Sequence, residues 1–235
     1  GMPFRPSRLP TAPSCATPSP LSDGSSQCSM SGMPNIDAYS SARRTSSAEA
    51  TGATPSECVA AFIVGCEVAA RLLRASPRLS NDGGWHSTGV VGAVAAAAAC
   101  AKLLKVPADK IADVLGISVS LASGVAVNYG TMTKPLHAGN AARNGVLAAL
   151  LGSRGFTSHA SAFEGTAGFF DTFSRGLSMS YEPFKDIGSR YDLVTLGYSL
   201  KAYPCGGRGH TAIEAALALR DRVGARLAGW GRGLR

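Results

Sequence analysis

The sequence predicts a mainly α-helical protein, and three observations support this. Of its 235 residues 45% are hydrophobic but only 7% are aromatic, and 28 are glycine, which favours small side chains and closely packed backbones over a bulky core. Apolar residues recur at helical spacing from residue 54 onward. The periodic stretches are bounded by capping residues, proline and glycine. The length allows one domain of ordinary size, or one domain with part of a second.

Residues 1–47 differ in composition and in hydrophobic pattern from the rest of the chain. They contain 12 serines and 7 prolines and show no apolar period of 2 or 3.6. Such a stretch buries too little surface to offset the entropy lost on ordering, so we expect it to be disordered or foreign to the helical domain. It also lacks the apolar core of a secretory signal, and we therefore expect a cytoplasmic protein.

The first helix is predicted from Thr54 to just before Pro77. The residues Thr54, Pro55, Ser56 and Glu57 form the pattern of a capping box with proline at the first helical position. Apolar residues then follow at helical spacing as far as Leu73.

The next two helices follow at short intervals. One is expected to begin near Ser87 or Thr88 and to run towards Pro107, and seven of its twelve residues in 90–101 are alanine. A helix with such small side chains can make close contact with neighbours on several sides. Pro107 then begins a third helix, which carries Ile111 and Val114 on one face.

A fourth helix is predicted to begin at Pro135 or shortly beyond it and to stop at Gly152 and Gly155. If Pro135 takes the first helical position, Lys134 lies near the cap and His137 in the first turn. The segment 163–173 adds a further short helix.

The last part of the chain changes character. Residues 191–203 show a strand-like pattern, and residues 211–223 then predict a helix that buries Ile213, Ala216 and Leu217. A strand and a helix after a run of helices indicate the beginning of a small α+β unit. We therefore divide the chain into the leader 1–47, a partial helical domain 48–190 and a truncated second unit 191–235.

Several classes of protein are excluded by composition and motifs. Of the net charge of +8, +2 lies in residues 1–47 and +4 in residues 220–235, which argues against a folded nucleic-acid-binding face. The longest uncharged run, 83–101, is mostly Gly and Ala and is too weakly apolar for a membrane span. The six cysteines form no C-x-x-C pair, so we expect reduced thiols, no metal site and no disulfide framework. Phosphate-loop, dinucleotide and H-E-x-x-H motifs are absent, and we expect no cofactor.

The candidate functional residues lie in three short turns, each of which precedes a predicted helix. They are His86; Thr133, Lys134 and His137; and Lys201, Arg208 and His210. The amino-terminal turn of a helix has free N–H groups and a partial positive charge, which favours a bound carboxylate or phosphate. This arrangement suits a small polyanionic molecule.

Simpler interpretations of these residues stay open. A lone histidine before a helix is more often a cap or a surface residue than a catalyst, and a single lysine is most often solvated. His210 and Glu214 have the i, i+4 spacing of metal ligands but lack a third ligand. Cys205 has no recognisable base beside it.

Three stretches resemble the MmgE/PrpD family. They are GTMTKPLHAGNAARNGVLAALLGSRGFT, the WHSTG before the alanine-rich helix, and KAYPC followed by GHTAIEAALALR. The resemblance covers roughly residues 48–220. It implies an all-helical domain with a smaller α+β lid, a homodimer, and cofactor-free acid–base elimination on a small polycarboxylate. A lyase of the 2-methylcitrate dehydratase type is the leading expectation, and decarboxylation and epimerisation remain alternatives.

The resemblance also assigns roles to residues. His86 and Lys134 match the family's catalytic His and Lys, and His210 matches a histidine of the later turn. Thr133, His137, Lys201 and Arg208 are expected to bind the substrate. This chain departs from the family at Gly206, where some members have a further catalytic histidine.

The two ends of the chain also depart from the family pattern. The arginine-, serine- and proline-rich leader stands where members have further helices, and the lid stops after its first strand and helix. We hypothesise that residues 1–47, and those after Arg220, are shifted-frame or replaced sequence. The rival interpretations are an inactive remnant or helical interaction module, and an anion-binding protein without turnover.

Overall fold

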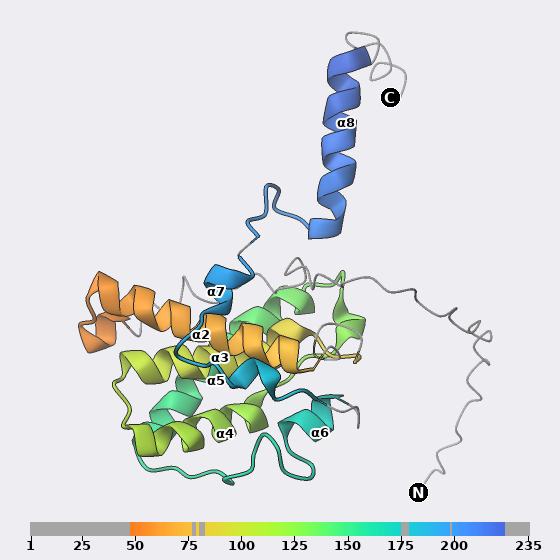
Figure 1. Ribbon diagram of the computed structural model, residues 1–235. Helices are drawn as coiled ribbons and strands as arrows, with labels where there is room; N and C mark the ends of the chain where they lie inside the picture. The colour runs from red at the N-terminus through yellow and green to blue at the C-terminus, as the bar shows by residue number, and fades with distance from the viewer. Residues whose placement is uncertain (1–47, 77–78, 80–82, 175–178, 198, 224–235) are drawn as a thin grey trace, which may run out of the picture.

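The computed structural model describes residues 48–76, 79, 83–174, 179–197 and 199–223 (Figure 1). The predicted leader 1–47 and the residues after 223 lie outside this range. The α-helices are α2 (Pro55–Ala75), α3 (Ser87–Leu103), α4 (Ile111–Leu121), α5 (Thr133–Ser153), α6 (Phe169–Ser174), α7 (Asp192–Thr195) and α8 (His210–Val223). Short 3-10 helices cover Ala108–Lys110, Ala126–Asn128, Glu182–Phe184 and Gly207–Gly209. The predicted mainly helical class is confirmed.

The capping box predicted for the first long helix is present. The backbone N–H of Glu57 donates to the Thr54 hydroxyl at 3.3 Å, and the backbone N–H of Thr54 donates to the Glu57 carboxylate at 2.8 Å. This second bond, together with Lys105 and the Thr54 hydroxyl, lowers the pKa of Glu57 to about 2. The structure therefore begins α2 at the residue that the sequence predicts.

Helix α3 lies in the middle of the helical body and contacts α2, α4 and α5. Its valines Val90, Val91 and Val94 are fully buried and pack with Phe169 of α6. The alanine-rich second half packs in another buried cluster with α4 and α5. The sequence-based expectation of contact on several sides is confirmed.

Small residues let the helices approach closely. A Cβ added to Gly145 of α5 would lie 2.4 Å from the Cβ of Ala96, and one added to Gly65 of α2 would lie 3.1 Å from the carbonyl oxygen of Ala95. The first contact leaves no room for a methyl group, and the second would require the neighbouring backbone to shift by a few tenths of an ångström. Glycine and alanine therefore set the spacing of α2, α3 and α5.

Helices α3 and α5 run in the same direction. His86 at the start of α3 contacts His137 near the start of α5, and Ala96 ten residues later is the neighbour of Gly145. The two amino-terminal ends consequently lie at the same end of the helical body.

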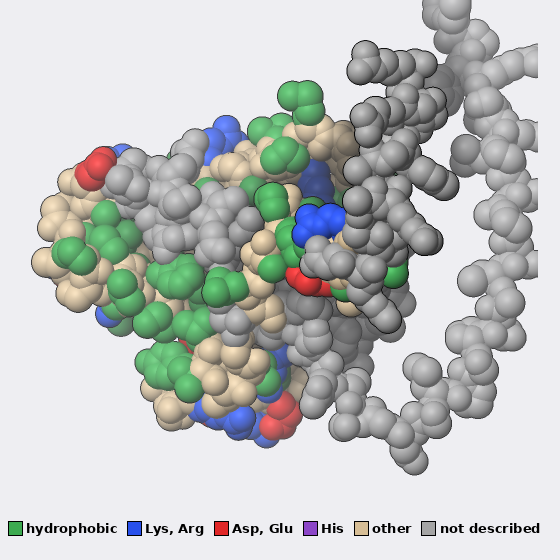
Figure 2. All heavy atoms as spheres, turned by 90° about the horizontal axis from the view of Figure 1, so that it is seen from above, with side chains coloured by type: hydrophobic (Ala, Val, Ile, Leu, Met, Phe, Trp, Pro, Cys, Tyr) green, Lys and Arg blue, Asp and Glu red, His purple; other side chains and the backbone are tan. Residues whose placement is uncertain are grey.

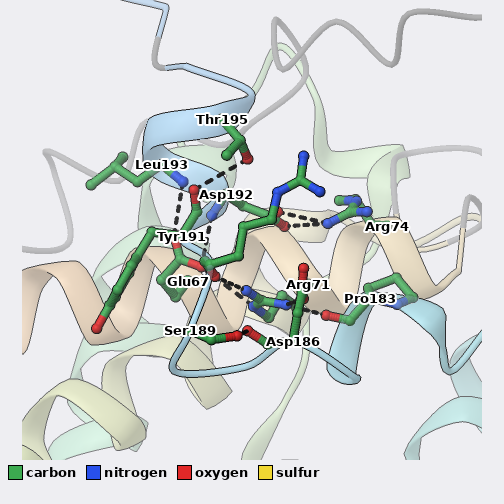
Figure 3. Close-up of polar contacts among 11 residues, drawn as sticks. Glu67, Arg71, Arg74, Pro183, Asp186, Ser189, Tyr191, Asp192, Leu193 and Thr195 are labelled. Carbon is green, nitrogen blue, oxygen red and sulfur yellow. Dashed lines mark hydrogen bonds and ion pairs between the residues drawn. The ribbon is translucent and has the colours of Figure 1, made fainter.

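A buried network of charges fastens α2 to residues 183–193 (Figure 3). The guanidinium of Arg71, only 1% exposed, donates to Glu67, to Asp186 at 2.6 Å and to the carbonyl oxygens of Pro183 and Arg190. Burial opposes the charged form of Arg71, but the hydrogen bond with Asp186 and the nearby carboxylates raise its pKa overall.

The same network extends to the start of α7. The Glu67 carboxylate accepts the backbone N–H groups of Asp192 and Leu193 at 3.0 and 2.8 Å, and the Asp192 carboxylate accepts two hydrogen bonds from Arg74 at 2.7 Å. Every buried charge thus has partners, as charge burial requires.

This network also explains one wrong prediction. The strand expected within 191–203 is not formed among the described residues of that stretch, where Asp192–Thr195 is the short helix α7 and turns follow. Glu67 satisfies the first N–H groups of α7, and no neighbouring strand is present in the described part of the chain to pair with residues 199–203. Val194 and Leu200 are 79% and 80% exposed, so the apolar pattern does not mark a buried face.

The prediction for the last helix is partly wrong. Helix α8 forms, but Ala216 is exposed, and Ile213 and Leu217 are only half-buried. In Figure 1, α8 stands apart from the helical body, which leaves its apolar side without the burial that the spacing predicts.

The surface has two features that bear on partners. On the face shown in Figure 2, lysine and arginine side chains lie in separate small groups, with exposed hydrophobic side chains between them. None of the helices in the described residues combines the length and apolarity needed to cross a membrane.

The close packing of α3 and α5 predicts opposite effects for two glycines of one helix. Gly145→Ala forces a methyl group against Ala96 and should lower the free energy of unfolding by about 1–3 kcal/mol. Gly139→Ala meets nothing within 4 Å and should raise it by about 0.5–1 kcal/mol, because alanine is the better helix former. Urea unfolding of both variants measures this, and equal effects would contradict the packing described.

The buried network predicts that Arg71 is costly to remove. Arg71→Met removes the buried guanidinium that donates to Glu67, to Asp186 and to two carbonyl oxygens, and should lower the free energy of unfolding by about 3–5 kcal/mol. Lys185→Met removes an exposed pair with Glu182 on the same segment and should change it by less than about 1 kcal/mol. A loss for Arg71→Met no larger than for Lys185→Met, measured by urea unfolding, would show that the network contributes little.

Candidate functional site

His86 occupies the N-cap position of α3 and is 6% exposed. Its backbone N–H donates to the carbonyl oxygen of Gly124 at 3.0 Å, and its own carbonyl accepts the N–H groups of Gly89 and Val90. These bonds fix the backbone on both sides of the imidazole. The simpler interpretation is that the His86 side chain caps the helix. In the structure the backbone of His86 makes these bonds, and its side chain forms no capping hydrogen bond.

The loop after α4 is held against α5 by two asparagines and against the start of α3 by the bond between His86 and Gly124. Asn144 of α5 donates to the carbonyl oxygen of Leu121 at 2.8 Å, and Asn140 donates to the Ser123 hydroxyl at 3.3 Å. Gly124 follows with φ +124°, a conformation that residues with a side chain rarely adopt. A Cβ at Gly124 would also lie 3.2 Å from the His137 ring, so this glycine touches both histidines of the site.

His86 and His137 are in direct contact. Their Nδ1 atoms lie 2.9 Å apart, which is hydrogen-bond distance, and their ring centroids are 5.2 Å apart. The structure therefore joins two of the three turns that the sequence singles out.

Lys134 joins the same group through Tyr129. Its Nζ lies 4.9 Å from the centre of the Tyr129 ring, and that ring packs edge-on against His86 with centroids 4.9 Å apart. An ammonium group over an aromatic face is attracted by the ring's negative face. Burial raises the pKa of the Tyr129 hydroxyl.

The start of α5 differs from the predicted start. The helix begins at Thr133, two residues before Pro135, because the Thr131 hydroxyl accepts the N–H of Thr133 and the Thr131 carbonyl accepts that of Lys134. Lys134 is thus the second helical residue and is exposed, whereas His137 is half-buried.

The electrostatics of this group favour neutral imidazole and bound anions. Burial is the largest cause that lowers the pKa of His86 to about 4, and the electrostatic effects of His137 and Lys134 add to it. The amino-terminal ends of two long parallel helices also meet here, each with a partial positive charge. A carboxylate is the kind of group that such an environment attracts.

The third turn forms a separate cluster. His210, the first residue of α8, packs edge-on against Tyr203 with centroids 5.3 Å apart, and the Tyr203 hydroxyl donates to Glu214. The hydrogen bond with Glu214 raises the pKa of Tyr203. Among the described side chains no hydrogen bond or ring contact joins His210 to His86 or His137. Lys201 is exposed in the same segment, and the side chain of Arg208 lies outside the described atoms.

Sequence reasoning missed several residues that build this arrangement. Gly124 and Tyr129 lie in the stretch of small residues between the predicted third and fourth helices. Glu67 and Arg71 have the i, i+4 spacing of a helical ion pair, but their partners lie more than 100 residues away. Within the described part of the chain, no group of three or more His, Cys, Asp or Glu side chains is placed to hold a metal ion.

Comparison with known proteins identifies the family. The family profile for the MmgE/PrpD N-terminal domain matches residues 42–182, which include His86, Lys134 and His137. The chain belongs to this family. The resemblance predicted from the sequence is thereby confirmed.

Curated relatives of this MmgE/PrpD family member include cis-aconitate decarboxylases. The protein of that name from Aspergillus terreus is 35% identical over 177 residues, which are 71% of this chain and 35% of the relative. The Homo sapiens protein of the same name is 32% identical over 168 residues, which are 69% of this chain and 34% of the relative. A cis-aconitate decarboxylase-like protein, oryM of Aspergillus oryzae, is 33% identical over 165 residues, which are 66% of this chain and 33% of the relative. This chain spans about a third of the length of these relatives.

The lowered pKa of His86 predicts acid sensitivity. Between the ordinary histidine pKa of 6.5 and about 4, the unfolded chain binds a proton at this position and the folded chain does not, so stability falls as the pH falls through this window. The full effect is on the order of 3 kcal/mol. Urea unfolding at pH 7 and pH 4 measures it.

Two substitutions control this measurement. His86→Asn removes the titrating group. The difference between its free energy of unfolding and that of the wild type should therefore shrink as the pH falls. His159→Asn, in an exposed loop, should retain the wild-type pH dependence. A wild-type pH dependence that survives in His86→Asn would contradict the pKa assigned to His86.

Proposed function

We propose that this chain carries part of the active site of a lyase that performs acid–base chemistry on a small polycarboxylate. The observation that carries the proposal is the 2.9 Å contact between His86 and His137 beside Lys134, at the end where α3 and α5 both begin. Imidazole is the side chain best suited to exchange protons near pH 7, and two helix ends with an ammonium group supply fixed positive charge. Membership of the MmgE/PrpD family and the lyase names of the relatives support it.

Each residue has a role in this proposal. His86 takes or gives a proton, Lys134 stabilises the negative charge that develops on the substrate, and His137 orients His86. Thr133 contributes to binding of a carboxylate at the same helix end. Lys201, Arg208 and His210 belong to the proposed site as ligands of a second carboxylate and as a further acid, and this part needs the segment 199–223 to close on the helical body.

The substrate is the finer part of the proposal. Cis-aconitate is the first candidate, because three relatives are named as cis-aconitate decarboxylases or as a protein like them. Dehydration of 2-methylcitrate, the expectation from the sequence, is the second. Both substrates carry three carboxylates, and both reactions place negative charge next to one of them.

A helical interaction module without catalysis is the alternative. Two observations favour it: Gly206 stands where some family members have a catalytic histidine, and apolar side chains next to the histidine pair are exposed. Val127, Met132 and Leu136 are 85%, 92% and 63% exposed. Exposed large apolar side chains close together in the sequence, on either side of the start of α5, are consistent with a contact surface.

A substrate panel with matched lysine variants distinguishes the two functions. The purified full chain is given cis-aconitate, 2-methylcitrate and citrate in deuterated water, and NMR follows products and deuterium incorporation. If the lyase proposal holds, one substrate turns over and Lys134→Ala lowers the rate about 100- to 1000-fold, because charge stabilisation in the transition state is lost.

The control for this assay is Lys102→Ala, an exposed lysine in the last turn of α3. It removes the same charge far along the helix from His86 and should retain the wild-type rate. Absence of any turnover or deuterium exchange in the wild-type chain would favour the interaction module.

A further inference from the structure

The contact between the two histidines restricts where their protons can be. Each imidazole has two nitrogens, and the Nδ1 atoms of His86 and His137 are used in the contact with each other at 2.9 Å. Each ring therefore has only Nε2 left for any other partner. A neutral imidazole carries one N–H, so two neutral rings share two protons among four nitrogens.

We propose that His86 and His137 act as one proton relay, in which the Nε2 of one ring is a base while the Nε2–H of the other is an acid. The reason is the hydrogen bond itself. The ring that donates its Nδ1–H has a bare Nε2, and the ring that accepts at Nδ1 must carry its hydrogen on Nε2. This inference rests on the proposed lyase function and assigns His137 a part in proton transfer beyond orienting His86.

The relay moves one proton without changing the number that the pair holds. The bare Nε2 forms an N–H bond as a substrate C–H bond breaks, and the electron pair stays on the carbon beside the carboxylate. The Nδ1–H bond of that ring breaks as an Nδ1–H bond forms on its partner. The partner's Nε2–H bond breaks in the same step and its proton goes to the hydroxyl group, whose carbon–oxygen bond breaks, so that water departs and the electron pair left on the carbon forms the new carbon–carbon double bond.

Decarboxylation uses the same relay with a different proton source. The carbon–carboxylate bond breaks, carbon dioxide leaves, and the electron pair left behind takes the proton from Nε2–H. The Nδ1–H bond of the other ring breaks as an Nδ1–H bond forms on the ring that gave its proton, and a proton from water enters at the bare Nε2 of that other ring, leaving hydroxide in the solvent, so the pair again ends as two neutral rings. The proton added to the product then comes from solvent, and none is taken from the substrate.

The surroundings of the pair favour the two-proton state. His86 is 6% exposed, its ring faces Tyr129, and the ammonium group of Lys134 lies over the same tyrosine. A third proton would place a second positive charge beside Lys134 in this buried position and would leave both Nε2 atoms as donors. The backbone of Gly124, which lies against both residues, contributes no charge.

Ring protonation can be measured directly in the full chain. In protein labelled with ¹⁵N, NMR that correlates the ring carbon-bound hydrogens with both ring nitrogens reports which nitrogen carries the proton. At pH 7 we expect two neutral rings whose Nδ1 protonation adds up to one proton. His159 is an internal reference, because its Nδ1 accepts the Ser161 N–H at 3.1 Å, which requires the hydrogen on Nε2 if the ring is neutral. His86→Asn, His137→Asn and His159→Asn assign the signals.

The outcomes separate the relay from the lyase proposal. Two rings of the pair that both carry hydrogen on Nε2 alone, or one ring with hydrogen on both nitrogens, would overturn the relay whether or not the chain is active. Where turnover is detected, His137→Asn should lower kcat about 100- to 10 000-fold and change KM much less. A change in KM with kcat retained would overturn the relay while the lyase function stands.

Discussion

The arrangement of the candidate site depends on how closely α3 and α5 approach each other. Gly145 lies against Ala96 and Ala97, where even a methyl group has no room, and the two helices run in the same direction. Parallel helices at this spacing bring His86 and His137 within one hydrogen bond, although 51 residues separate them in the sequence. Gly124 and the two asparagines of α5 then hold the intervening loop beneath the rings. The small residues at the contact of α3 with α5 are therefore a geometric requirement of the histidine pair.

Charged groups serve two purposes in this protein. Between α2 and residues 183–193, Arg71, Arg74, Glu67, Asp186 and Asp192 neutralise one another, and the backbone N–H and carbonyl groups around them are also satisfied. At the amino-terminal ends of α3 and α5, the described residues offer Lys134 an aromatic face and no carboxylate. The first arrangement holds the chain together. The second leaves positive potential at the surface beside a buried imidazole, which is the environment that a substrate carboxylate would need.

The sequence predicts local features of this fold well and distant ones poorly. The Thr54 capping box and the alanine-rich helix depend on neighbouring residues, and the structure has them as predicted. The roles of Glu67 and Arg71 depend on residues more than 100 positions away, which no short pattern indicates. The prediction of a strand within 191–203 was wrong for the same reason. The distant Glu67 carboxylate accepts the first N–H groups of helix α7 in that stretch. The turns that carry His86, Lys134 and His137 could be recognised from the sequence, whereas Tyr129, which lies between two of them, could not.

The anchoring of residues 183–193 on α2 also determines where the chain can vary. Arg71 and Glu67 hold this segment up to Leu193, and the turns that lead to α8 leave from that fixed point. Exposed connecting segments tolerate changes of length far better than packed ones. Insertions or deletions between Leu196 and Tyr203 would consequently alter the reach and direction of α8 while the imidazoles keep their positions. The position of α8 can therefore change in evolution while His86 and His137 keep theirs.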